Sequence, residues 1–485
     1  MLLTYILLII LYIINSSKSE KIIFAGIHFR HGARGPLKLN GNGQDLLGIN
    51  WSSTGELTTT GKMMHYLLGL RNRQRYITEY KLLSEKFDQH ELVVYCSDLN
   101  RTLLSVASQL QGLYPIDSNK EEIISKEQLD VAVPPVNITF DEINETKNSL
   151  NESALPNFMT IIPVHFIDFL IDNSDECNQK INKLHMKNVK TKESIINSTN
   201  NFKKKYSDKL LKYYNDSIIT NLNFTIITAI CDATVADLIE KRNMTDFFFQ
   251  NNINGEDFIK ECYDILEINF RDNLFSDDNN ELLLFYNSFI IERIIHYMKK
   301  RIDDDIKGDV SKANASDYSS PKMFILSGHD TTLTAQELFF IKFFNFSLDS
   351  YTFPTFASQT IFEITREEVN NDSRKDLKYS NYTLYHYFND NLVFKMTFDQ
   401  FMDQMDKIVL WKSNDMKKFC YGENQKPSLT PNIIIIIGMG IFVLVLIIII
   451  IILCVKIKNK KTPSLDDELQ KGNLIIGIPS DEKED

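Results

Sequence analysis

The sequence predicts an α/β sandwich in which a largely parallel β-sheet carries helices on both faces, with a mainly helical cap and one C-terminal transmembrane helix. Three observations support this. Apolar runs are followed by short polar loops and then usually by helical patterns. Residues 116–278 are rich in Asn, Lys, Asp and Glu and lack clear strands. Residues 433–455 carry no charge and are long enough to span a bilayer.

Three units define the sandwich, each made of an apolar strand, a short polar loop and usually a helix. They are "KIIFAGIHF" followed by "RHGARGP" (21–36), "ELVVYC" followed by "SDLNR" and an apolar helical repeat (91–114), and "KMFIL" followed by "SGHD" and a helix (322–344). Ligands of α/β folds bind at the carboxyl ends of the strands. The charged residues of the three loops are therefore expected to converge on one crevice.

Helical spacing is clear in two further stretches. Leu57–Tyr76 places Met64, Leu67 and Leu68 on one face. In 281–301, apolar side chains recur at helical spacing from Leu282 onward. Residues 301–320 are expected to form a polar loop. The α/β catalytic domain is thus predicted to comprise 20–115 and 279–424, and the helical cap to comprise 116–278.

The two ends of the chain predict membrane topology. Residues 1–19 are mostly apolar and end in small residues, which favours a signal peptide cleaved before Glu20, with an N-terminal anchor helix as the alternative. Lysines follow the apolar run 433–455 and favour a cytoplasmic tail at 456–485. We therefore expect a single-pass type I membrane protein, with its body in the lysosomal or endosomal lumen or at the cell surface.

Composition and sequons are consistent with a secreted body. The chain has 485 residues and a net charge of −11, which argues against nucleic acid as a partner. Asn-X-Ser/Thr sequons precede the membrane run and none follows it; they begin at Asn50, Asn137, Asn144, Asn151, Asn197, Asn215, Asn223, Asn243, Asn314, Asn345, Asn371 and Asn381. Asn100 also begins a sequon, but we expect it to be buried in the crevice and unmodified.

Six cysteines are present, and Cys454 falls in the membrane run. Cys96 ends a strand-like run and is expected to be a buried free thiol. The other four, Cys177, Cys231, Cys262 and Cys420, are expected to form two disulfides. Four cysteines allow three pairings, and the sequence does not choose among them.

The charged loops predict a site for an anion. Around His31, the crevice is expected to hold Arg30, Arg34, Arg101, His329 and Asp330. Guanidinium groups match phosphate oxygens, an imidazole can act as a nucleophile, and a carboxyl group can protonate a leaving alcohol. Gly32 is expected to let the backbone approach the ligand. The remaining histidines are expected to be structural or on the surface, without metal-ligand spacing; they include His28, His65, His165 and His386.

These motifs resemble those of the histidine acid phosphatases. "RHGARGP" fits the RHGxRxP signature and "SGHDTT" the HD signature, and the arginine loop "YCSDLNR" lies between them. The two residues after His329-Asp330, Thr331 and Thr332, look most like the prostatic and lysosomal branch. His28 and the set of cysteines depart from the family pattern.

The resemblance implies a phosphoglycerate-mutase-like three-layer sandwich and an enzyme that hydrolyses phosphate monoesters. His31 would carry the phosphoryl group as phosphohistidine, and Asp330 would protonate the leaving group. The phosphate would be bound by Arg30, Arg34, Arg101 and His329. The resemblance implies no metal and no organic cofactor.

Three alternatives remain at this stage. An inositol-polyphosphate phosphatase, similar to the phytases, would need cations from the cap, which the Lys-rich stretch 183–212 would supply. A lysophospholipid phosphatase is favoured only by the membrane helix. A catalytically silent, receptor-like ectodomain is the third alternative. The sequence leaves open whether the protein is a monomer or a homodimer.

Overall fold

The computed structural model describes residues 20–421, except for 41, most of 117–158, and 168–174, 211–221, 275–279 and 309–319. The expected signal peptide (1–19), transmembrane helix (433–455) and tail (456–485) all lie outside the described residues. Within the described residues, we find no helix with the length and apolar character needed to cross a membrane.

The described strands form one mixed sheet of seven strands in the order β3-β2-β4-β1-β5-β6-β7. β3, β2, β4 and β1 are mutually parallel, whereas β1, β5, β6 and β7 pair antiparallel. Their bounds are β1 Glu20–Arg30, β2 Leu92–Cys96, β3 His165–Phe166, β4 Met323–Gly328, β5 Gln359–Glu367, β6 Tyr382–Phe388 and β7 Asn391–Thr397.

The expectation of a largely parallel sheet is therefore wrong for the β5–β7 half. Only residues 389 and 390 separate β6 from β7. Two residues allow a hairpin, whereas a parallel crossover needs a dozen or more. The parallel half, in contrast, contains the three strand–loop–helix units that the sequence predicted.

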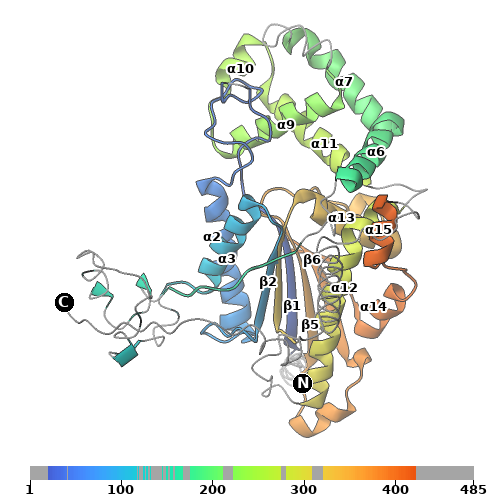
Figure 1. Cartoon of the computed structure of the whole chain (residues 1–485). Coiled ribbons are helices and arrows are strands. Elements are labelled where there is room, and N and C mark those ends of the chain that lie inside the picture. Colours follow the sequence, from blue (N-terminus) through green and yellow to red (C-terminus); the bar gives the residue numbers. More distant parts are fainter. Residues whose placement is uncertain are drawn as a thin grey trace, which may run out of the picture. The chain divides into compact units, whose positions relative to one another are not determined.

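Helices cover both faces of the sheet (Figure 1). On one face, Ile27 of β1 packs in a core with Leu110 of α3 (Asn100–Leu113), beside α2 (Thr59–Arg73). On the other face, Phe24 packs with Ile294 and Phe339 of α12 (Glu281–Lys307) and α13 (Asp330–Phe343). β1 is buried on both faces, which explains why its sequence is almost continuously apolar. Two further helices, α14 (Phe398–Met405) and α15 (Ser413–Tyr421), follow the sheet.

Two helices differ in detail from the sequence predictions. The buried face of α2 is formed by Gly61, His65, Gly69 and Asn72, not by Met64, Leu67 and Leu68. A Cβ atom on Gly69 would collide with the carbonyl oxygen of Gln109 on α3, so the glycine lets the two helices approach closely. α12 extends to Lys307, into the stretch expected to be a polar loop, and Gly308 ends it with a φ of 71°.

The segment expected to form the cap is mainly helical where it is described. Its helices are α6 (Asp175–Thr191), α7 (Glu193–Leu210), α9 (Phe224–Ile239), α10 (Thr245–Gln250) and α11 (Gly255–Leu274). Phe202, Ile230 and Phe258 form an apolar core of their own, and Leu47 from the loop before α2 joins that core. β3 also comes from this segment, yet it pairs with β2 of the main sheet.

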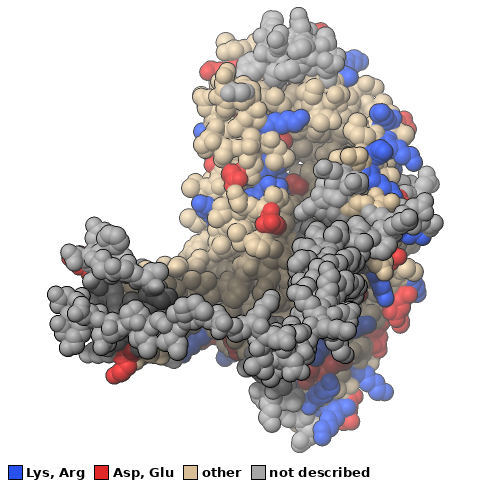
Figure 2. Space-filling model, in the orientation of Figure 1, with Lys and Arg blue, Asp and Glu red and all other residues tan. Residues whose placement is uncertain are grey.

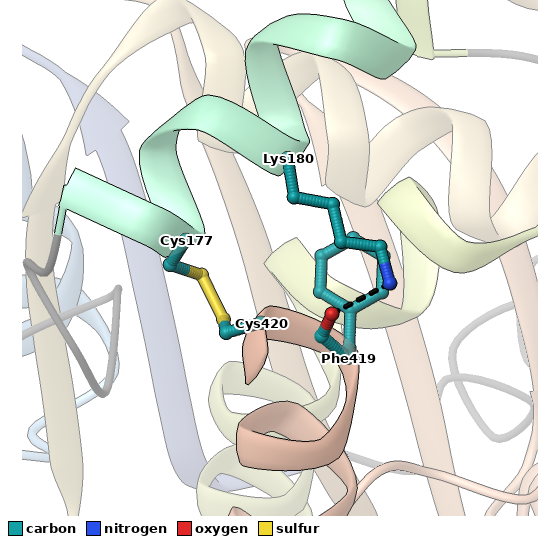
Figure 3. The surroundings of a disulfide bond; sticks show 4 residues. All are labelled: Cys177, Lys180, Phe419 and Cys420. Carbon is teal, nitrogen blue, oxygen red and sulfur yellow. Dashed lines mark hydrogen bonds between the residues drawn. A yellow bond between two sulfur atoms is a disulfide. The ribbon is translucent and has the colours of Figure 1, made fainter. Parts of the chain in front are cut away.

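One disulfide, Cys177–Cys420, connects α6 to α15 (Figure 3). Beside it, the Nζ of Lys180 donates a hydrogen bond of 2.6 Å to the carbonyl oxygen of Phe419. Cys96, Cys231 and Cys262 are buried free thiols. The prediction of a buried free thiol at Cys96 is therefore confirmed. Two disulfides were expected among the other four cysteines, and the structure contains one of them.

Candidate active site

The loops after β1, β2 and β4 meet at one edge of the sheet. The backbone N–H of His31 donates to Gly328 at 3.0 Å, and that of Ser97 donates to Ser327 at 3.2 Å. These loops line a cavity of about 850 Å³. All six residues that the sequence singled out line this cavity: Arg30, His31, Arg34, Arg101, His329 and Asp330. The convergence inferred from the strand ends is thus present in the structure.

The loop after β1 is held by tight backbone packing. A Cβ atom on Gly32 would collide with the backbone of Gly61 in the first turn of α2. The N–H of Gly32 donates to the Oγ of Ser105 at 3.1 Å, and this hydroxyl donates to the carbonyl oxygen of Arg101 at 2.7 Å. The structure therefore gives Gly32 a packing role. It also connects His31 to Arg101 through a single side chain.

His31 is held as a neutral imidazole in one tautomer. Its Nδ1 lies 2.9 Å from the carbonyl oxygen of Gly32, so Nδ1 carries the proton and the Nε2 lone pair is available. Burial, followed by the charges of Arg30 and Arg34, holds the pKa of His31 well below its usual value. A neutral imidazole with a free lone pair is the form that a nucleophile requires.

Arg30 and Asp330 form a buried ion pair, with 2.7 Å between Nη2 and Oδ2. Arg30 also donates to the carbonyl oxygen of Pro354 at 2.7 Å and lies 4.2 Å from the centre of the Phe356 ring. Burial acts to raise the pKa of Asp330, but Arg30 and then Arg34 outweigh it and the pKa is lowered. Without a bound anion, Asp330 is therefore held as a carboxylate.

Arg34 is paired with a carboxylate from the cap. Its two Nη atoms donate to Asp232 of α9 at 2.8 and 3.2 Å, and the N–H of Leu37 donates to the same carboxylate at 2.9 Å. The Nε atoms of Arg30, Arg34 and Arg101 are buried and have no hydrogen-bond partner among the described residues. Three crowded guanidinium groups with unused donors form a site suited to an oxyanion.

His329 is the N-cap of α13, and Asp330 is its first helical residue. The Nε2 of His329 lies 2.8 Å from the Oγ of Ser97, and its ring centre lies 5.5 Å from that of His31. Burial, followed by the charge of Arg101, lowers the pKa of His329 to about 3. The hydrogen bond to Ser97 fixes the orientation of the neutral His329 ring at the wall of the cavity.

A second row of polar residues supports the loop after β4. The ring nitrogens of His28 lie 3.0 Å from Gln336 Oε1 and 3.1 Å from Thr332 Oγ1, and Thr332 in turn accepts from the N–H of His329. His28, His65 and His386 are buried, as expected of structural histidines, whereas His165 is exposed on β3. The departure at His28 thus has a structural reason, because this ring orients the motif that contains His329.

Sequence reasoning missed Ser97 and Asp232. Ser97 lies within the quoted loop "SDLNR", and its position directly after a strand was a usable signal. Asp232 lies on α9, far from every motif, and nothing local in the sequence distinguishes it. The prediction that Asn100 is buried is wrong: it is exposed, in the first turn of α3, and 3.4 Å from Glu56.

The lysines of 183–212 that the structure describes, all except Lys212, do not line the cavity. Lys183, Lys187 and Lys204 are exposed, and Lys205 pairs with Glu261 at 2.7 Å. Figure 2 shows basic side chains along the outer surface of the region where α6 and α7 run in Figure 1. These lysines therefore form a solvated surface and do not surround the site.

Comparisons with known proteins agree with the sequence motifs. The sequence profile of the Histidine phosphatase superfamily (branch 2) matches residues 21–382. The lysosomal acid phosphatase of Xenopus laevis is 32% identical over 99 residues, which cover 20% of this chain and 22% of that protein. The prostatic acid phosphatase of Bos taurus is 31% identical over 99 residues, covering 20% and 24%. The matches thus span about a quarter of these curated relatives.

Solved structures of similar fold include the phytase from Citrobacter braakii, with 12% identity, a TM-score of 0.49 and coverage of 80% of this chain and 98% of that one. The multiple inositol polyphosphate phosphatase of Bifidobacterium longum has 12% identity, a TM-score of 0.44 and coverage of 78% and 88%.

Proposed function

Because the chain belongs to the histidine phosphatase superfamily (branch 2), we propose that it is an acid phosphatase that hydrolyses phosphate monoesters through a phosphohistidine on His31. One observation carries the proposal: a neutral imidazole with a free Nε2 lone pair lies among three guanidinium groups that have unused donors. This arrangement suits an anionic electrophile and a nitrogen nucleophile.

Binding and phosphoryl transfer follow from these residues. Arg30, Arg34 and Arg101 bind the phosphate oxygens, and His329 forms a hydrogen bond to one of them. The Nε2 of His31 attacks phosphorus, the bond from phosphorus to the ester oxygen breaks, and that oxygen takes the proton of Asp330. The resulting imidazolium ring is stabilised because its Nδ1–H donates to the carbonyl oxygen of Gly32.

Dephosphorylation reverses the proton transfer. A water molecule attacks the phosphoryl group, and the Asp330 carboxylate accepts its proton. The bond from Nε2 to phosphorus breaks, which returns neutral His31 and releases phosphate. Asp330 is near enough for both steps, because its ion pair with Arg30 holds it beside the phosphate-binding groups.

The domain boundaries and the membrane topology belong to the same proposal. The catalytic domain comprises 20–115 and 279–424 and the helical cap 116–278, while 1–19 is a signal peptide and 433–455 anchors the chain as a type I protein. Support comes from the apolar runs in the sequence and from sequons that are exposed in the structure: Asn50, Asn197, Asn223, Asn243, Asn345 and Asn381. The disulfide between α6 and α15 fits an oxidising lumen, lysosomal or extracellular.

The test is hydrolysis of p-nitrophenyl phosphate by the purified full-length chain between pH 3 and 9. We expect turnover that is highest in acid and lost in His31→Ala. Reactions with a ³²P-labelled ester that are quenched in alkali, where phosphohistidine is stable, should give labelled wild type and unlabelled variant. Exposed His296, replaced by alanine, is the matched control. Folded, glycosylated wild type without turnover would contradict the proposal and favour a silent ectodomain.

A further inference from the structure

The cap side of the cavity carries a single acid and is otherwise uncharged. Of the residues that the described cap helices α9 and α11 contribute to the cavity, the charged one is Asp232, and neither helix contributes a lysine or arginine there. Apolar side chains make up half of this wall: Ala229, Val235, Ile239, Leu266 and Phe270. The uncharged polar residues are Thr225, Thr228, Tyr263 and Asn269. Phe353 and Phe356 also line the cavity, and the ring centre of Phe353 lies 5.6 Å from that of Phe270.

Asp232 also reduces the charge available to a ligand. It takes both Nη atoms of Arg34, at 2.8 and 3.2 Å, so one of the three phosphate-binding cations is already neutralised from the cap. Beyond the six predicted site residues, the cavity has one further described cation, the exposed Lys38. These charges suffice for one phosphate group but leave nothing to compensate several more.

We propose that the site selects phosphate monoesters of apolar alcohols, alkyl or aryl, and that Asp232 is the residue that excludes substrates with several phosphates. The leaving group contacts the wall of α9 and α11, where burial of each methylene group favours binding. A second phosphate group in the same place would lose its hydration beside the Asp232 carboxylate and would have no cation to pair with. The inference rests on the proposed phosphatase activity and specifies its substrate class.

The first experiment compares esters that differ only in the length of an unbranched chain. Methyl, butyl and hexyl phosphate share one leaving-group chemistry, so differences in kcat/KM report contacts with the wall. We expect kcat/KM to rise with each added methylene, by up to about fourfold. myo-Inositol hexakisphosphate should be hydrolysed at least about a hundredfold less efficiently than hexyl phosphate, because the described cap helices supply no cations to the cavity.

Two reciprocal variants on α9 test the wall itself. Val235→Thr keeps the side-chain volume and adds a hydroxyl, and it should flatten the dependence on chain length. Thr228→Val, also in the cavity lining, makes the opposite change and should steepen it. Both residues lie outside the arginine cluster, so hydrolysis of methyl phosphate monitors folding and basal chemistry in each variant.

Asp232→Asn tests the acid. The variant should favour inositol hexakisphosphate over hexyl phosphate about tenfold more than the wild type does, measured as the ratio of their kcat/KM values. The reason is that one negative charge beside Arg34 is removed, and this change in the ratio holds even if both rates change. An unchanged ratio would overturn the role of Asp232. Equal kcat/KM across the alkyl series would overturn the apolar substrate class but not the phosphatase. Absence of hydrolysis of every ester would instead refute the proposed function.

Discussion

At the residue scale, the lowered pKa values of His31 and Asp330 fit an acid phosphatase. The pKa of His31 is lowered, first by burial and then by Arg30, so the nucleophile stays neutral in acid. The pKa of Asp330 is also lowered, because Arg30 and Arg34 outweigh the effect of burial. The proton that the leaving group requires is therefore scarce on Asp330 near neutrality and becomes more available as the pH falls.

The first prediction concerns this pH dependence. kcat/KM for an alkyl phosphate, which reports ionisation of the free enzyme, should fall continuously as the pH rises from 4 to 8. Asp330→Ala should lower kcat for that ester by about 10²–10⁴. The loss should be smaller with p-nitrophenyl phosphate, whose stable phenolate leaves without a proton. Equal losses on the two esters would show that Asp330 is not the proton donor.

Ser97 carries the second prediction. Its hydroxyl lies 2.8 Å from the Nε2 of His329, so it fixes the orientation of the ring that forms a hydrogen bond to the phosphate. Ser97→Ala should reduce kcat/KM about tenfold through one lost orienting hydrogen bond, while Ser97→Thr retains most activity. Ser108→Ala, which removes an exposed hydroxyl on α3, is the matched control. Full activity in Ser97→Ala would mean that other contacts orient His329.

At the element scale, the disulfide between α6 and α15 carries the third prediction. It closes a loop of 243 residues and fixes the first described helix of the cap segment to the last described helix of the chain. Cys177→Ser/Cys420→Ser should lower the free energy of unfolding by about 2–4 kcal/mol in urea titrations. Cys96→Ser, at a buried free thiol, is the control. If instead peptide mapping of unreduced protein joins Cys177 to another cysteine, the pairing is wrong.

Sequence reasoning succeeded for elements whose signals are local. β1, β2, β4 and the helices after the last two were predicted, because an apolar run followed by a helical repeat needs no knowledge of partners. The antiparallel half was not, since strand direction depends on which strands pair. The face of α2 was also missed, because Gly69 is buried through its contact with α3 and not through hydrophobicity. Asp232 eluded prediction for the same reason: its partner Arg34 is 198 residues away.

At the scale of the whole molecule, an enzyme that works in acid must remain folded there, and its buried histidines oppose this. Burial lowers the pKa of His28 and of His65 to about 4, and that of His386 to about 3. In the unfolded chain, these rings titrate near pH 6.5. As the pH falls below this value, the unfolded chain binds protons that the folded chain does not, so stability decreases toward the pH at which the folded rings protonate.

His386 allows this coupling to be measured away from the active site. Its ring is fully buried and stacked on Phe362 with 4.3 Å between ring centres, and neither ring nitrogen has a hydrogen-bond partner among the described residues. Between pH 6.5 and 4, this histidine should make the free energy of unfolding fall by about 1.4 kcal/mol per pH unit. His386→Phe should remove that part of the slope in urea titrations across the range, whatever its effect at pH 7. The exposed His296, replaced by Phe, should leave the slope unchanged.

A slope that stays the same in His386→Phe would mean that His386 gains its proton in the folded protein as readily as in the unfolded chain, through water or a local opening of β6 and β7. Loss of the slope would show that the lowered pKa of buried His386 limits the acidity at which this phosphatase stays folded.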